Sequence, residues 1–484
     1  MAAIGGIPVF IVYSMLSSVM PRTGGDYVFQ SRATHPALGF TIVGGGYIFF
    51  MFGWFVYPAW YLASSSLTPL LGWLGETYGN PVFMGVASWF MTADGLVLAG
   101  TLMNVLAFIV IIMGLRAYVR LQYLIMATNF VAWVIMMALF ATNTPTTFTT
   151  SLDSYALKFL GESNFVEKVI SEASSIGYYP KPAFSWHSTL SIMALFWMLQ
   201  MWNAYAVCQL GEIRGAENFK LNLRYTLGAS WLNVFIVCTL LAVFFNTVTE
   251  DFWTALCSLG YEGILTLTIA GQAFNIPALS MILTSNPILI GLITLGFALH
   301  SFQIAYNAQL GGTRVTFAAT FDRLLPSGLA RVYARFTSPI GAALMFAIGG
   351  ELAILIYNYV RDAWTYILSI AFTSVLIPLF TTVAGIVFPY RSSTKEIYKT
   401  SPISKYRVGN VPAISVVGVL GLIFQLICMY FYLTVEAFGI IYFPSVAVII
   451  GAYVAFAIWF YAAKWYRSRQ GIDVDLAYRQ IPPA

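Results

Sequence analysis

Positively charged residues lie almost only in every second gap between the long apolar stretches of this chain. There are eleven such stretches, and most contain the roughly twenty apolar residues that an α-helix needs to cross a bilayer. Of the 24 Lys and Arg residues, only four fall in the alternate gaps, namely Lys158, Lys168, Lys181 and Arg361. Because cytoplasmic loops retain Lys and Arg, this alternation predicts an odd number of spans, an external N-terminus and a cytoplasmic C-terminus.

The sequence therefore predicts an all-α polytopic protein of the cell membrane, with a single transmembrane domain over residues 1–466. An extracytoplasmic loop is expected at 143–187, with one amphipathic surface helix over 152–170, and a cytoplasmic tail at 467–484. The predicted spans cover residues 4–21, 38–66, 92–114, 119–142, 189–213, 223–247, 287–311, 339–359, 364–388, 411–434 and 440–465.

Two connections need an explicit interpretation. Residues 263–283 are apolar enough to form a further span, but a crossing there would move Arg314, Arg323 and the basic tail to the outside. We therefore expect an extracytoplasmic, partly re-entrant segment. The inner connection 313–338 contains Val315 and Phe321 in a pattern that suggests a short helix along the inner membrane surface.

Composition excludes several other classes of protein. With 59% hydrophobic and only 9% charged residues, the chain does not provide enough polar side chains to cover a soluble globule. The net charge of +5 resides in the inner loops, so no nucleic-acid partner is expected. The four cysteines are scattered, which argues against a disulfide framework or a zinc site, and no cofactor is expected.

The turn after the first apolar stretch reads Met20-Pro-Arg-Thr-Gly-Gly-Asp-Tyr-Val-Phe29. Its Gly pair permits a tight turn with positive φ, and Asp26 stands near the start of the next helix, where the helix dipole favours an anion. Three further strings follow, namely Gly211-Glu-Ile-Arg214, the run from Arg314 through Phe317, Ala318, Asp322 and Leu325 to Pro326, and Tyr406-Arg-Val-Gly409.

In this order and in these loops, the four strings resemble the amino acid–polyamine–organocation permeases. The resemblance covers the chain to about residue 434 and implies a leucine-transporter-like bundle of two inverted five-helix repeats plus two helices. In the family the first string follows the second helix, whereas here it follows the first span. The first family helix, whose broken backbone binds the amino acid, is therefore expected to be missing, through either a misplaced start or a truncation.

The resemblance implies a secondary transporter of amino acids or related organic amines, working by alternating access in the lipid bilayer. A non-transporting, N-terminally truncated homologue acting as a sensor or inactive permease is the alternative. A channel would need a repeated filter or a charged ring, and neither is visible in the sequence. No HExxH, GxSxG or P-loop string supports an enzyme.

Polar side chains at membrane depth are the candidate site residues, because such groups tend to face the bundle interior. In the 189–213 span, Gln200 and Asn203 share one helical face, with Trp202 and Tyr205 beside them. By the resemblance this is the helix whose unwound centre contacts substrate. A substrate site and a packed hydrogen-bonding face both explain the pattern.

Candidate groups for ion coupling lie in two later spans. His300 and Asn307 lie with Gln303 on one stripe of the 287–311 span, and Ser301 is adjacent to it. Glu351 lies near the middle of the 339–359 span. A buried carboxyl is expected to be neutral or paired, so reversible protonation of Glu351 with His300 as its partner is one interpretation and packing is the other. Coupling to H⁺, coupling to Na⁺ and exchange all remain open.

Overall fold

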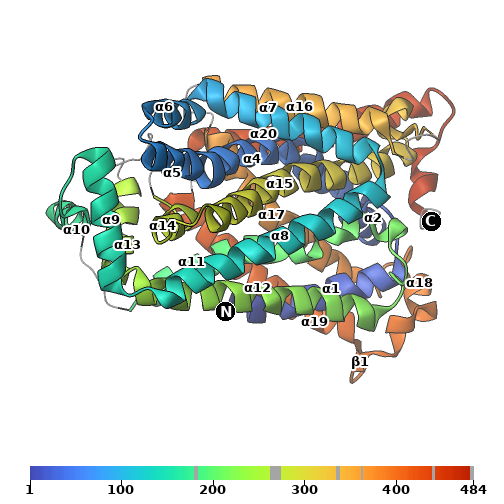
Figure 1. The fold of residues 1–484 in the computed structure, drawn as a ribbon. Coiled ribbons are helices and arrows are strands. Elements are labelled where there is room, and N and C mark those ends of the chain that lie inside the picture. Colours follow the sequence, from blue (N-terminus) through green and yellow to red (C-terminus); the bar gives the residue numbers. More distant parts are fainter. Residues whose placement is uncertain (179–183, 262–273, 334–337, 361–363, 439–441, 480–484) are drawn as a thin grey trace.

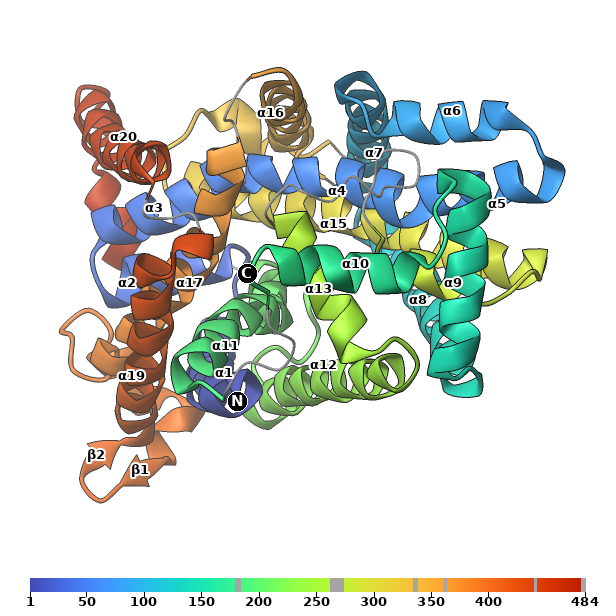
Figure 2. The ribbon, with the colours of Figure 1, turned by 90° about the vertical axis from the view of Figure 1, so that its left-hand side faces the viewer.

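The protein is a bundle of long helices that run in the same general direction in Figure 1 and cross one another at an angle in Figure 2. The computed structural model describes residues 1–178, 184–261, 274–333, 338–360, 364–438 and 442–479. Within this part, ten helical stretches are long and apolar enough to cross a membrane. The predicted all-helical, multi-span membrane fold is therefore confirmed.

The helices of the bundle correspond to the apolar stretches of the sequence. One of them is a continuous helical run over Pro36–Tyr78, which changes between α, π and 3₁₀ geometry along its length. It consists of α3 (Pro36–Gly44), η1 (Gly45–Phe49), η2 (Phe50–Phe55), α4 (Val56–Leu62), η3 (Ala63–Leu67) and α5 (Thr68–Tyr78). The others are α1 (Ala2–Val19), α7 (Ala93–Ile112), α8 (Leu115–Thr142), α11 (Trp186–Met201), α12 (Phe219–Thr247), α15 (Pro287–Phe321), α16 (Ile340–Tyr359), α17 (Trp364–Val387), α19 (Ala413–Thr434) and α20 (Phe443–Ser468).

Short elements gather at the two ends of the bundle (Figures 1 and 2). The first end, called the α2 end below, carries α2 (Gly25–Ala33), η5 (Leu210–Glu212), η6 (Ser327–Ala330), α18 (Lys395–Thr400), η7 (Pro402–Lys405), the antiparallel pair β1 (Arg407–Val408) and β2 (Val411–Pro412), and η9 (Val474–Arg479). The opposite end, called the α9 end, carries α6 (Pro81–Phe90), α9 (Pro145–Leu160), α10 (Phe165–Ser175), α13 (Glu250–Tyr261), α14 (Ile276–Ile282) and η8 (Glu436–Phe438).

Side-chain caps define where several helices begin. The side chain of Asn80 accepts a hydrogen bond from the Val82 backbone at the start of α6, and Thr92 does the same for the Gly95 backbone at the start of α7. Asn218 and Asn286 cap α12 and α15 in the same way. Such caps satisfy backbone N–H groups that have no partner within the helix.

Two predicted surface helices differ from the observed elements. Residues 313–321 continue α15 instead of forming a separate helix, because the helix runs unbroken through Gly311 and Gly312. In the 143–187 loop, the single helix expected at 152–170 is replaced by α9 and α10, because Gly161 ends α9 in the left-handed conformation with φ of 69°. Lys181, Arg361, residues 263–273 and the start of the 440–465 span lie outside the described residues.

The outer faces of the bundle are apolar. Leu98, Leu102 and Val105 of α7 are exposed, and α16 carries a similar row with Leu344, Ile348 and Leu352. A water-facing surface rarely exposes so many neighbouring aliphatic side chains. These faces are suited to contact with lipid.

Close packing inside the bundle depends on small residues at the start of α1. Trp197 of α11 is fully buried, and its ring centroid lies 5.6 Å from that of Phe10 and 5.0 Å from that of Phe424 of α19. A Cβ atom on Gly6 would come within 2.2 Å of the Trp197 ring, and one on Gly5 within 2.3 Å of the Phe424 ring. The glycines therefore let α1 approach both helices closely.

Candidate functional site

A cavity of about 620 Å³ lies between the helices of the bundle. Its walls come from η2, α4, α8, α11, α12, α15 and the segment η4 (Trp202–Cys208), which extends α11 as a 3₁₀ helix. The residues that line this cavity are mainly aromatic or carry neutral hydrogen-bonding groups. These include Trp54, Tyr57, Tyr61, Tyr118, Gln122, Trp202, Tyr205, Gln209, Asn233, His300, Gln303 and Asn307.

The change from α to 3₁₀ geometry at Met201 separates the four residues predicted to contact substrate. Residues three apart eclipse one another in a 3₁₀ helix, so Trp202 and Tyr205 lie on one face, with ring centroids 4.8 Å apart. Both rings line the cavity. The structure therefore brings these two predicted residues together at the cavity wall.

Gln200 and Asn203 face α12 instead of this cavity. The Gln200 side-chain oxygen accepts hydrogen bonds from Asn203 Nδ2 at 3.0 Å and from Ser230 Oγ at 2.7 Å. Asn233 Nδ2 in turn donates to Asn203 Oδ1 at 3.1 Å. This arrangement corresponds to the packed hydrogen-bonding face that the sequence left as an alternative.

The three candidate residues of α15 also divide between two roles. His300 and Asn307 line the cavity, and Asn307 Oδ1 accepts a hydrogen bond of 2.8 Å from the Tyr118 hydroxyl. The His300 ring stands edge-on to that of Tyr61 at 6.2 Å. Ser301 is buried and donates to the Phe297 carbonyl of its own helix at 2.8 Å, so it closes a helical turn.

Glu351 joins α16 to α7. Its two oxygens accept hydrogen bonds from Thr101 Oγ1 at 2.5 Å and Asn104 Nδ2 at 3.0 Å. Asn104 also donates to the Ala347 carbonyl at 2.8 Å, which reinforces the same helix contact. His300, which was considered as its partner, lies on the cavity wall instead.

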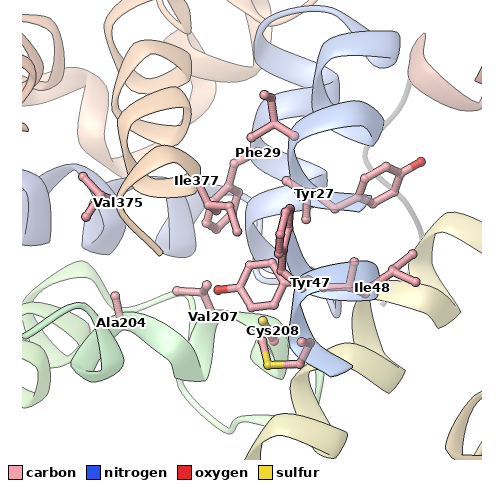
Figure 3. Close-up of a cluster of buried hydrophobic side chains, with 14 of the residues drawn as sticks. Tyr27, Phe29, Tyr47, Ile48, Ala204, Val207, Cys208, Val375 and Ile377 are labelled. Atoms are coloured by element: carbon pink, nitrogen blue, oxygen red, sulfur yellow. The ribbon is translucent and has the colours of Figure 1, made fainter. Parts of the chain in front are cut away.

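A row of four aromatic rings lies beside the cavity, and three of them, Trp54, Trp202 and Tyr205, line it. Trp54 stands edge-on to Trp202 at 4.9 Å, Trp202 contacts Tyr205, and Tyr205 lies 5.8 Å from Tyr47. We call Trp54, Trp202, Tyr205 and Tyr47 the aromatic wall. In Figure 3, Tyr47 lies above Cys208, with its hydroxyl group on the side of Val207.

Behind the aromatic wall lies a smaller cavity of about 50 Å³ that contains Asp26. This carboxylate is only 1% exposed. It accepts hydrogen bonds from the hydroxyl groups of Thr381 at 2.5 Å, Tyr13 at 2.6 Å and Tyr47 at 3.2 Å. Sequence reasoning placed Asp26 correctly in the first turn of a helix but did not identify this site.

The sequence strings assemble around the α2 end of the bundle. Gly24 and Gly25 have φ of 96° and 29°, as expected for the tight turn, and the Gly24 N–H donates to the Cys208 carbonyl at 2.9 Å. Arg314 of α15 donates twice to the Glu212 carboxylate, at 2.8 and 3.1 Å. Three strings far apart in the chain therefore build one junction.

The second ion pair of this junction joins α2 to α15. Arg32 donates to both oxygens of Asp322 at 2.6 and 2.8 Å, and Tyr27 donates to the same carboxylate at 2.5 Å.

Comparison with known protein families gives a match over almost the whole chain, in which the family model described as amino acid permease covers residues 1–463. The chain belongs to the amino acid permease family. No curated protein matches the chain.

Membership of this family confirms the resemblance seen in the four strings. The permease is a multi-pass membrane protein of a transporter family and is not an enzyme. Of the eight residues predicted as candidate site residues, Trp202, Tyr205, His300 and Asn307 line the central cavity. Gln200 and Glu351 bond to neighbouring helices, and Ser301 bonds within its own helix. Asn203 bonds to α12 beside a separate cavity of about 270 Å³.

Proposed function

We propose that this permease is a secondary transporter that carries an amino acid or a related organic amine across the cell membrane by alternating access. The observation that carries the proposal is the central cavity of about 620 Å³, which lies within the bundle and is lined by helices from both halves of the chain. This volume is within the range of roughly 300–1,000 Å³ that is typical of small-molecule sites.

The lining is suited to a small polar molecule with an apolar part. Gln122, Gln303, Asn307 and Asn233 supply amide donors and acceptors, and the aromatic wall supplies apolar surface. Polar side chains at membrane depth are costly unless they face a cavity or a partner. Their concentration around one cavity supports a solute pathway.

The end of α11 supports movement around this cavity. The α-helix ends at Met201 and continues as 3₁₀ helix through Trp202–Cys208, at the point where Trp202 and Tyr205 meet the cavity. Transporters commonly bind solute where a membrane helix departs from regular geometry. We assign the substrate contacts to Trp202 and Tyr205, and coupling to H⁺ or Na⁺ to His300 and Asn307.

The orientation follows from charge. The α2 end carries the basic connections of the chain, including α2, α18 and the C-terminal segment (Figure 1). Because positively charged loops remain in the cytoplasm, this end is assigned to the cytoplasmic side. The α9 end, which carries the long connection 143–187, then faces the outside.

Counterflow in liposomes tests the transport proposal. Purified protein is reconstituted into vesicles loaded with one unlabelled amino acid or polyamine at a time, and uptake of the same labelled compound is followed with H⁺, Na⁺ or no gradient. At least one compound should accumulate transiently without a gradient, and Trp202→Ala should reduce its rate at least tenfold. Ile348→Ala, on the exposed face of α16, is the matched control and should leave the rate within twofold.

Absence of counterflow for every compound in a folded, reconstituted protein would contradict the transport proposal. Equal rates in Trp202→Ala and the wild-type protein would contradict the assignment of the cavity as the solute pathway.

A further inference from the structure

The buried carboxylate of Asp26 has no cationic partner among the described residues. The ion pairs of this part of the chain involve other acidic groups. The three partners of Asp26 are the hydroxyl groups of Tyr13 on α1, Tyr47 on η1 and Thr381 on α17. A buried charge is stabilised fully only when an opposite charge is added to such hydrogen bonds.

The cavity beside Asp26 has room for a small group. Its volume is about 50 Å³, compared with about 620 Å³ for the larger cavity. This space admits a group of the size of a water molecule or an ammonium group. The larger cavity, which shares Trp54, Trp202 and Tyr205 with it, has space for the remainder of a molecule that carries such a group.

A second acceptor in the small cavity comes from a proline within α17. Pro378 has no backbone N–H, so the Ser374 carbonyl lacks the partner that it would have in a regular helix. Ser374 and Pro378 both line the small cavity. Asp26 and the residue whose carbonyl has no helical partner therefore border the same space.

Aromatic faces complete the lining. Tyr47, Trp54, Trp202 and Tyr205 all border the small cavity. The faces of aromatic rings attract cations, and cages of this kind are used to bind ammonium groups. Negative charge, carbonyl oxygen and aromatic faces together favour a cationic nitrogen over a neutral or anionic group.

We propose that Asp26 and the aromatic wall form a binding site for the protonated amine of the transported compound, at the α2 side of the central cavity. This site deepens the proposed transport function and rests on it. The amine nitrogen donates to Asp26 and to the Ser374 carbonyl, while the remainder of the molecule extends past Trp202 into the larger cavity. A carboxylate group on the substrate is not required for this contact.

The protonation behaviour of Asp26 agrees with this assignment. Burial raises the pKa of the Asp26 carboxyl above its usual value, and the hydrogen bonds from Thr381, Tyr13 and Tyr47 oppose that shift. Within the described part of the chain, the thiol of Cys208 is a further titratable group close to it. Since the hydroxyl groups only partly offset the cost of burial, a bound cation would stabilise the ionised carboxylate further.

Binding of n-butylammonium to the full-length protein in lipid nanodiscs tests the site, with n-butanol as the neutral probe of similar size. The wild-type protein should bind n-butylammonium at least tenfold more tightly than n-butanol. Asp26→Asn should weaken n-butylammonium binding at least tenfold and leave n-butanol binding unchanged. Glu351→Gln, which makes the same acid-to-amide change between α16 and α7, is the matched control and should bind like the wild-type protein.

Tyr47→Phe tests the same idea if Asp26→Asn does not fold. It keeps the ring but removes the longest of the three hydrogen bonds that favour the ionised Asp26 carboxylate, so n-butylammonium binding should be lost at a higher pH than in the wild-type protein as the pH is lowered. An unchanged pH dependence in Tyr47→Phe, equal binding of the two probes, or full binding by Asp26→Asn would each overturn the proposal. Because the assay measures binding without transport, its outcome is independent of the counterflow result.

Discussion

Arg32 makes two hydrogen bonds, of 2.6 and 2.8 Å, to the carboxylate of Asp322, a residue 290 positions further along the chain. The Arg32 and Asp322 side chains are only 3% and 6% exposed, respectively. The pair connects α2 to the end of α15, and Tyr478 of the C-terminal segment lies 4.7 Å from the guanidinium group. The α2 end is therefore held together by a buried, two-point ion pair.

Breaking this pair should strongly destabilise the protein. Arg32→Ala leaves Asp322 buried without its cation, and removal of one partner of a buried pair typically costs about 3–5 kcal/mol. Asp322→Ala should cost a similar amount, and the double variant should cost less than the sum of the two. The check is the denaturation midpoint of the detergent-solubilised protein. Lys399→Ala, in an exposed pair with Glu396, is the control and should leave the midpoint nearly unchanged.

The turn at Gly24 provides a second test. Its φ of 96° is unfavourable for other residues, and a Cβ atom there would lie 2.5 Å from the Cβ of Ala318. Gly471 has a φ of 73° but nothing within 4 Å of a Cβ atom. Gly24→Ala should therefore lower the midpoint clearly more than Gly471→Ala, which carries only the backbone strain of about 1–3 kcal/mol. Equal shifts would show that the contact with α15 is not tight.

The C-terminal segment should contribute to stability through Tyr478. This ring is 7% exposed and packs on Arg32, and its hydroxyl lies 3.0 Å from that of Tyr27. Tyr478→Ala should cost about 3 kcal/mol, in line with other buried aromatic truncations. Leu476→Ala, in the same short helix but 55% exposed, serves as the control and should be nearly neutral. Similar midpoints for both variants would mean that the segment does not dock in solution.

Glu351 should act in helix packing and not in ion coupling. Glu351→Gln retains an acceptor for Thr101, so the pH dependence of uptake should match that of the wild-type protein. Glu351→Leu loses both hydrogen bonds to α7 and should lower the denaturation midpoint. Uptake by the vesicles used for counterflow, measured from pH 5 to 8, is the check. A changed pH profile in Glu351→Gln would restore Glu351 as a coupling group.

Much of the fold was predictable because hydropathy and charge report directly on membrane crossing. The helix ends were less predictable. Pro36–Tyr78 continues well beyond residue 66, and its last part, α5, packs against α6 and α14. The break of the surface helix at Gly161 depends on a single backbone conformation, which a helical hydrophobic pattern does not reveal.

The site was only partly predictable. Sequence spacing placed Gln200 and Asn203 on one face correctly, but it does not say which neighbour that face meets. Trp202 and Tyr205 meet the cavity because the helix tightens after Met201, and no Gly or Pro marks that change. Asp26 was not recognised because its partners come from three other elements, with Thr381 at a distance of 355 residues in the chain.

Two-sided accessibility of the cavity tests the account most directly. Gln303 lines the cavity, so Gln303→Cys introduces a thiol there. The substitution is made in a background in which the exposed Cys238 and Cys257 are replaced by serine. An impermeant thiol reagent is added to either face of the membrane, with and without the compound identified by counterflow. The account predicts labelling from both faces in proportions that this compound shifts. Labelling from neither face, or from both faces at rates that the compound leaves unchanged, would contradict it.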